Sequence, residues 1–524
     1  MLLHEYMEYF AREAPDQLCV EMEVTSFSYD EANRRCNQIA HACTAAGLQP
    51  GDRFAWLSKN SIDLMLIFYA ASKVGVIPVP LNYRLAPAEW QYIINDCRAR
   101  ALVCDSELCE AIDSVRDDLE HIEIFLATGA GTNALPQADW SGFDNWIAER
   151  PDTQPDHYGK PEDALYQMYT SGTTGLPKGA VLSQRAIDNN TRMIGTEMGV
   201  QGRDTRFLLV LPMYHAAAGV SHKAMVSVGG SVIIHREFNP LDTVDALQEK
   251  QITNCTLVPA MIQACLVHVA DINDREFPDL DAMAYGASPI AEEILRRAMA
   301  VFKCDFLQVF GMTETTAVST ILSAAAHRRA LAGEVHLLSS CGRAAVGTHI
   351  RIVDDNGDEV DRGTVGEISV RGPQLMTTYW NLPEATEKTL RDGWLMTGDA
   401  AYMDDEGYIF IQDRIKDMIV SGGENVYPAE VEGALFEHPN VADAAVIGIP
   451  SERWGETILA FLVTRDGKPI DTDEVIAFCR DRLAGYKIPR EVKCIEEIPR
   501  NPSGKVLKKD LREPYWEGIE RRVG

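Results

Sequence analysis

The chain alternates short apolar runs with longer stretches in which apolar residues recur every three or four positions. Apolar runs of strand length occupy 206–212 and 280–285, and the helical pattern extends over 291–303. Pro259 follows a further apolar run and fits the first turn of a helix, where a backbone N–H is not needed. Strands that alternate with helices in this way predict an α/β fold.

Two of the predicted strands end in loops of small and polar residues. The strand at 280–285 leads into Gly286-Ala287-Ser288, and a strand at 306–310 leads into Gly311-Met312-Thr313-Glu314. Open α/β sheets bind ligands beyond the carboxyl ends of their strands. We therefore predict that both loops contribute to a ligand site.

A β-rich subdomain is predicted from about residue 340 to residue 413, within a large N-terminal domain of residues 1–413. The chain changes there to short strands separated by turns, and Asn356-Gly357 is a strong hairpin signal. The residues after 416 carry their own pattern of helices and strands and are numerous enough for a compact domain. We predict a hinge at 414–416 and a smaller C-terminal domain at 417–524.

Acidic residues outnumber basic ones by a wide margin. The 524 residues include 49 Lys and Arg against 78 Asp and Glu, which gives a formal net charge of -29. Nucleic acids and anionic membranes attract positively charged proteins, so this charge argues against both as partners. A bound nucleotide would therefore have to be held by local groups.

The cysteines and the apolar runs predict a cytoplasmic protein without stable membrane insertion. The 12 cysteines are scattered, with no CxxC pair, which suits small buried residues in a reducing compartment. The opening MLLHEYMEYF lacks the basic start of a signal peptide and suits an amphipathic surface helix. The apolar run at 64–71 is far shorter than the ~20 residues that span a bilayer.

The string TSGTTGLPKG at 170–179 has the composition of a phosphate-binding loop. Its glycines let backbone N–H groups converge on an anion, its hydroxyls supply further donors, and Lys178 adds a positive charge. The lysine is not followed by Ser or Thr, so the string differs from the Walker loop of kinases and GTPases. The predicted nucleotide contacts in it are Thr170, Ser171, Gly172, Thr173, Thr174 and Lys178.

Several further strings follow this loop in order, and together they resemble the adenylate-forming enzymes: acyl-CoA synthetases, peptide-synthetase adenylation domains and firefly-type luciferases. The resemblance implies a large N-terminal domain of α/β subdomains with a β-rich subdomain, and a small mobile α+β C-terminal domain. It also implies that ATP activates a carboxylic acid as acyl-AMP before the acyl group moves on. The strings are LPMYH at 211–215, YGAS at 285–288, FGMTE at 310–314, TGD at 397–399, DRIKDMIVSGGENVYPAEVE at 413–432 and PRNPSGK at 499–505.

The resemblance implies a role in nucleotide binding for residues in these strings. Phe310 would stack on adenine where relatives more often carry tyrosine, and Gly286, Ala287, Ser288, Gly311 and Met312 would surround the nucleotide. Thr313 would donate to the α-phosphate, and Glu314 would hold Mg²⁺, a hard cation that prefers oxygen ligands. Asp399 would accept both ribose hydroxyls, and Arg414 would reach the same sugar.

The resemblance also implies roles for residues of the C-terminal part. Lys505 matches a catalytic lysine that stabilises charge developing between the substrate carboxylate and the α-phosphate. Lys416 matches the hinge about which the small domain rotates between the two half-reactions. Gly422 and Gly423 are expected to contact coenzyme A.

The acyl pocket implied by the resemblance consists of His215, Ala217, Ser221, Ala284 and Val309. His215 has two interpretations: a pocket wall near the carboxylate or the CoA path, and a satisfied core residue. Val309 stands where many relatives have glycine, so its bulk favours a short or medium acyl acid. Gly219 and the neighbouring alanines are small, so space for a larger acyl group could exist on another side of the pocket.

The expected reaction partners are ATP, Mg²⁺, a small carboxylic acid and coenzyme A as the acceptor. An acyl-AMP ligase that loads a carrier protein remains an alternative, as does an oxygenase of the luciferase type. An inactive nucleotide-binding regulator is disfavoured by the presence of Lys178, Glu314 and Lys505. The sequence leaves a homodimer open.

Overall fold

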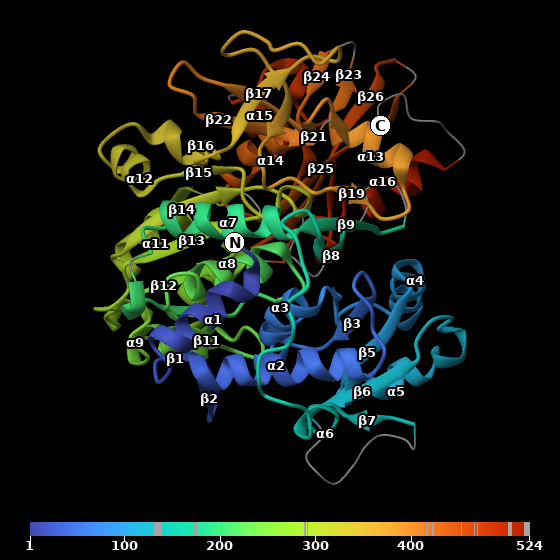
Figure 1. Cartoon of the computed structure of the whole chain (residues 1–524). Coiled ribbons are helices and arrows are strands. Elements are labelled where there is room, and N and C mark those ends of the chain that lie inside the picture. Colours follow the sequence, from blue (N-terminus) through green and yellow to red (C-terminus); the bar gives the residue numbers. More distant parts are fainter. Residues whose placement is uncertain are drawn as a thin grey trace. The chain divides into compact units, whose positions relative to one another are not determined.

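The computed structural model (Figure 1) forms two compact units, each with its own core. The first comprises Met1–His349 and Arg371–Gly393, and the second comprises Ile350–Val370 and Trp394–Gly524. The structure describes residues 1–129, 139–170, 176–200, 202–287, 290, 292–414, 417–421, 424–451, 453–465, 467–468, 470–480, 482–500 and 506–517.

The first unit contains a nine-stranded sheet whose central strands run parallel and whose edges are antiparallel. Parallel strands need crossover connections, which the chain supplies as helices between successive strands. In spatial order the strands are β16 (Arg343–Ala344), β15 (Thr320–Leu322), β14 (Asp305–Phe310), β13 (Ala282–Gly286), β12 (Asn254–Leu257), β10 (Arg206–Leu209), β11 (Ser231–Ile234), β1 (Leu18–Met22) and β2 (Thr25–Ser28).

The first unit also contains two smaller sheets. One is parallel, in the order β4 (Ile77–Leu81), β3 (Arg53–Leu57), β5 (Ala99–Asp105), β6 (Ile124–Thr128) and β7 (Ser141–Gly142). The other is antiparallel, in the order β19 (Thr378–Tyr379), β9 (Lys178–Ser183) and β8 (Ala164–Thr170).

The helices of the first unit bury apolar faces against these sheets and against one another. Pro259 opens α10, as its position after an apolar run predicted. The helices are α1 (Leu3–Glu13), α2 (Tyr29–Ala45), α3 (Ile62–Val74), α4 (Pro87–Cys97), α5 (Cys109–Asp113), α6 (Phe143–Ala148), α7 (Gln184–Glu197), α8 (Ala216–Val226), α9 (Pro240–Glu249), α10 (Pro259–His268), α11 (Glu292–Phe302), α12 (Ala324–Leu331) and α13 (Pro383–Thr389).

The second unit consists of two sheets with short helices. One sheet contains β17 (His349–Val353), β18 (Gly366–Arg371), β21 (Trp394–Met403) and β22 (Ile409–Arg414), and β20 (Leu390–Arg391) precedes β21 in the chain. The other has the order β24 (Glu424–Val426), β23 (Ile419–Ser421), β26 (Gly455–Thr464) and β25 (Val441–Ser451), with β27 (Glu491–Cys494) paired to β26. The helices are α14 (Pro428–Phe436), α15 (Thr472–Arg480) and α16 (Lys508–Trp516).

The local predictions made from the pattern hold in the structure. The predicted strands at 206–212, 280–285 and 306–310 are β10, β13 and β14, and the predicted helix at 291–303 is α11. Val353 and Glu359 form a β-bridge on either side of Asn356-Gly357, and Gly357 has a φ of 86°. Ten of the 12 cysteines are buried, and Cys494 is exposed. None of the helices in the described ranges is both long and apolar enough to cross a bilayer.

Candidate functional site

The two loops predicted to form a ligand site leave the same edge of the large sheet. β13 and β14 are neighbours in the sheet (Figure 1). They run parallel, and Gly286 pairs with Val309 at their carboxyl ends. A Cβ on Gly286 would lie 2.2 Å from the Val309 carbonyl oxygen, so only glycine permits this approach. The next residue, Ala287, has a φ of 69°, a conformation that non-glycine residues seldom adopt. The backbone at the end of β13 is therefore tightly constrained at Gly286 and Ala287.

The ends of the predicted phosphate loop are held by an antiparallel hairpin. Thr170 closes β8 and Lys178 opens β9, and the two residues are direct partners in the ladder. The Lys178 ammonium lies 5.2 Å from the ring centroid of Tyr379, within the range of a cation–π interaction. The hairpin thus delivers Lys178 beside the loop in which the sequence predicts phosphate contacts.

Glu314 is a buried carboxylate with a defined orientation. Glu314 is only 5% exposed, and its Oε1 accepts a hydrogen bond of 2.6 Å from the Tyr379 hydroxyl. Among the described residues, no hydrogen bond reaches Oε2. A carboxylate oxygen on the middle residue of the short 3-10 helix Thr313–Thr315 fits the oxygen preference of Mg²⁺.

His215 is half-buried at the N-cap position just before α8 and packs against Tyr214, with ring centroids 4.4 Å apart. Burial, followed by the positive charge of Arg84, lowers the pKa of His215 to about 4, so the ring is neutral at pH 7. Its Nε2 is buried and has no hydrogen-bond partner among the described residues. Buried polar atoms are normally paired, so this favours the interpretation of His215 as a pocket wall over a satisfied core residue.

The other predicted pocket residues come from α8, β13 and β14. Ala284 belongs to the main apolar core of the first unit, and Ala217 and Val309 pack against the same core. Ser221 is buried on α8. A Cβ on Gly219 would lie 2.4 Å from the Tyr166 hydroxyl. Tyr166 therefore fills the space that the absence of a side chain at Gly219 could have opened in the pocket.

Asp399 and Arg414 are backbone partners in a strand pair of the second unit. Asp399 on β21 is the direct partner of Arg414 on β22. Asp399 is buried, and its backbone N–H donates to the Thr397 hydroxyl at 3.1 Å. The ladder therefore juxtaposes the two residues to which the resemblance assigns one sugar.

The described residues on either side of 501–505 pair with each other. Arg500 and Val506 form an antiparallel bridge, and the Leu507 N–H donates to the Pro499 carbonyl at 2.8 Å. Several predicted site residues lie outside the described residues, and their roles stay predictions: Ser171, Gly172, Thr173, Thr174, Ser288, Lys416, Gly422, Gly423 and Lys505.

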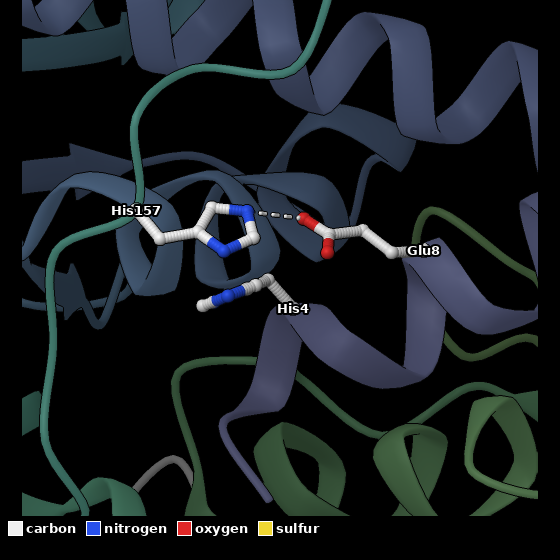
Figure 2. Close-up of side chains that lie close together, drawn as sticks. All are labelled: His4, Glu8 and His157. Carbon is white, nitrogen blue, oxygen red and sulfur yellow. Dashed lines mark hydrogen bonds and ion pairs between the residues drawn. The ribbon is translucent and has the colours of Figure 1, made fainter.

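Sequence reasoning missed a histidine and glutamate cluster near the N-terminus. Figure 2 shows His4 and Glu8, one turn apart on α1, close to His157 from the segment before β8. The His157 Nε2 lies 3.0 Å from Glu8 Oε1. The fully buried Lys73 ammonium lies 2.5 Å from the same oxygen. Because Lys73 already neutralises Glu8, the cluster is better explained as a contact that fastens α1 than as a cation site.

Two further residues that the sequence did not single out are Tyr379 and Lys223. Lys223 on α8 is fully buried, and its Nζ lies 4.2 Å from the ring centroid of Phe68. Burial lowers the pKa of Lys223 well below the usual value. Neither residue belongs to a recognisable string. The contacts of Lys223 with Phe68 and of Tyr379 with Glu314 come from distant segments of the chain.

Comparison with known proteins decides the family. Residues 7–380 match the family model of the AMP-binding enzyme, and residues 430–505 match that of the AMP-binding enzyme C-terminal domain. The chain belongs to the AMP-binding enzyme family. This membership confirms the resemblance to adenylate-forming enzymes and the predicted α/β fold with a large N-terminal and a small C-terminal domain.

Relatives in this AMP-binding family are similar over nearly their whole length. A fatty acid–[acyl-carrier-protein] ligase, ScoC of Streptomyces coeruleorubidus, is 36% identical, with 98% of this chain and 96% of ScoC covered. An indoleacetate–CoA ligase of Aromatoleum aromaticum is 34% identical, with 98% of each chain covered. The structure of ATP-bound MatB from Rhodopseudomonas palustris has a TM-score of 0.88 at 27% identity, with 99% of this chain and 100% of MatB covered.

Proposed function

We propose that this AMP-binding enzyme is an acid–thiol ligase that uses coenzyme A. It would convert a carboxylic acid and ATP to acyl-AMP and pyrophosphate, and then transfer the acyl group to the CoA thiol with release of AMP. The observation that carries the proposal is the buried pair of Tyr379 and Glu314 beside Lys178 at the end of the phosphate loop. The activities named for the two relatives, both acid ligases, support it.

The adenylation step needs groups that counter negative charge. Lys178 would interact with the phosphates as they leave, and Thr313 would donate to the α-phosphate. Glu314 would hold Mg²⁺, which supplies positive charge to the polyphosphate when bound. Lys505 would stabilise the charge that develops as the substrate carboxylate attacks the α-phosphate.

His215 would contribute orientation rather than charge. Its neutral ring carries one donor and one acceptor nitrogen, and Nε2, which has no partner among the described residues, could bond a substrate oxygen. Because a neutral imidazole does not give up a proton to the substrate carboxylate, that carboxylate stays charged and nucleophilic. We therefore assign His215 to positioning the acid in the pocket.

The acid is proposed to have a short or medium acyl chain. Val309 Cγ2 would lie 2.8 Å from a Cβ on Gly286, so the valine occupies the space beside the strand end. Tyr166 fills the side next to Gly219. Both observations support a pocket of limited depth around Ala217 and Ala284.

The acceptor distinguishes two candidate functions. CoA is named as the acceptor of the Aromatoleum relative, whereas ScoC acts on an acyl-carrier protein. The second candidate is thus an acyl-AMP ligase that loads a carrier protein.

A pyrophosphate-release assay with a panel of fatty and aromatic acids tests both candidates. Each acid is incubated with ATP and Mg²⁺, alone, with CoA, and with a phosphopantetheinylated carrier protein. We expect acid-dependent pyrophosphate release and a CoA thioester as the product. Thioester on the carrier protein alone would establish the second candidate, and no pyrophosphate with any acid would refute both.

A further inference from the structure

We propose that Tyr379 is a positioning residue for Glu314, which it holds in the orientation that receives Mg²⁺ beside the phosphate loop. This inference rests on the proposed function, because it takes Glu314 as the magnesium ligand. Tyr379 lies in a segment, residues 374–380, that we call the strap.

The strap bonds the loop that carries Glu314 and strand β9 at the same time. On one side it contacts the loop that carries Glu314, and on the other it contacts β9, which begins at Lys178. The bonds are Thr316 Oγ1 to the Gln374 carbonyl at 2.6 Å, Met376 N–H to the Glu314 carbonyl at 2.8 Å, Thr377 N–H to the Val181 carbonyl at 2.9 Å and Trp380 N–H to the Gly179 carbonyl at 2.7 Å.

The Tyr379 side chain has little freedom within this strap. Tyr379 is 5% exposed and is the direct partner of Ala180 in the ladder of β19 and β9. Its backbone N–H donates to the Thr386 hydroxyl at 3.0 Å. The hydroxyl therefore reaches Glu314 from a fixed backbone, and the same ring lies beside Lys178.

A hydrogen bond from a hydroxyl to a carboxylate is short and strong, and 2.6 Å is within the range of such bonds. By donating to Oε1, the Tyr379 hydroxyl restricts rotation of the Glu314 carboxylate. Oε2 is then the oxygen left to bind Mg²⁺. Groups that orient a metal ligand in this way commonly change metal affinity by about 10- to 100-fold when they are removed. Tyr379 should accordingly act on metal affinity more than on the chemical step.

The Tyr379→Phe variant tests the inference, because it keeps the buried ring and removes only the hydroxyl. The direct readout is Mn²⁺ binding in the presence of α,β-methylene-ATP, measured by electron paramagnetic resonance on the full chain. We expect Mn²⁺ affinity to fall about 10- to 100-fold. In the pyrophosphate assay, the KM for Mg²⁺ should rise by a similar factor, while kcat at saturating Mg²⁺ changes little.

Tyr29→Phe is the matched control, because Tyr29 is fully buried and donates a hydrogen bond of the same 2.6 Å length to the Gly230 carbonyl. It should bind Mn²⁺ like the wild type. Wild-type Mn²⁺ affinity in Tyr379→Phe, or an equal loss in Tyr29→Phe, would overturn the inference.

Glu314→Gln separates this inference from the proposed function. If Glu314→Gln loses Mn²⁺ binding and Tyr379→Phe does not, the inference about Tyr379 fails and the proposed role of Glu314 stands. If Glu314→Gln binds Mn²⁺ normally, the metal role of Glu314 fails, and the inference fails with it.

Discussion

The Lys508 ammonium lies 2.9 Å from Glu432 Oε1 in the second unit, and both side chains are largely shielded from water. Asp413 adds a second carboxylate at 3.5 Å. Burial alone would lower the pKa of Lys508, but the two carboxylates outweigh burial and raise it. The cluster ties the start of α16 to α14 and to strand β22.

Replacing Lys508 with methionine should destabilise the second unit strongly. Removal of one partner leaves buried carboxylates without a counter-charge, which typically costs about 3–5 kcal/mol. Urea unfolding of the full chain measures the loss. Lys509→Met is the matched control, because Lys509 is exposed, and a surface change of this kind stays within about 0.5 kcal/mol. Equal effects of the two substitutions would contradict the importance of the buried cluster.

Acid should destabilise the first unit through His4. Burial lowers the pKa of His4 to about 4, and the charges of Lys73 and His157 act in the same direction against that of Glu8. Between pH 6.5 and pH 4 the unfolded chain therefore binds a proton that the folded chain does not, so stability falls as the pH falls. At pH 5 this contribution amounts to about 2 kcal/mol.

Urea unfolding of wild type and His4→Gln at pH 7 and pH 5 measures this contribution. The variant should lose less stability between the two pH values than the wild type, whatever its stability at pH 7. His121→Gln, which changes an exposed histidine, should retain the wild-type difference. If His4→Gln lost as much stability between pH 7 and pH 5 as the wild type, His4 would be ruled out as the source of the acid destabilisation.

Gly286→Ala should disturb the end of β13. The new Cβ would meet the Val309 carbonyl oxygen at 2.2 Å, and backbone atoms on both strands would have to move. We expect a loss of about 1–3 kcal/mol in the free energy of unfolding and reduced pyrophosphate release. The control is Gly195→Ala in α7, where a Cβ meets nothing within 4 Å and alanine favours the helix by up to about 1 kcal/mol. A Gly286→Ala protein as stable and active as the wild type would show that the close approach is unimportant.

Lys505→Ala should impair adenylation selectively. The loss of one electrostatic donor to the transition state corresponds to about 3–4 kcal/mol in the first half-reaction. Thioester formation from pre-made acyl adenylate and CoA should stay nearly normal, since that step does not use the lysine. Equal losses in the two half-reactions would refute the assignment, and Lys509→Ala should affect neither.

Local features of the fold could be predicted from neighbouring residues. The alternation of apolar runs placed β10, β13, β14 and α11, and the Asn356-Gly357 pair placed a hairpin. Such features depend on periodicity and turn chemistry within about ten residues, which a single sequence displays directly. The loops after β13 and β14 were predicted to share a site because parallel strands end at the same edge.

Side-chain environments could not be predicted in the same way. His4 lies on an apparently amphipathic helix, yet it is fully buried beside Ser72. Lys73 follows an apolar run as a polar residue would at a helix end, yet it is fully buried and paired with Glu8. Periodicity states which face a residue occupies, but the elements that cover that face come from elsewhere in the chain.

The sequence by itself determined the α/β fold and the family, because these depend on the order and type of neighbouring residues. Only the tertiary structure decided that Tyr379 meets Glu314, 65 residues away, and that Lys508 meets Glu432. Both contacts depend on how distant segments pair and pack, and no local pattern encodes that pairing.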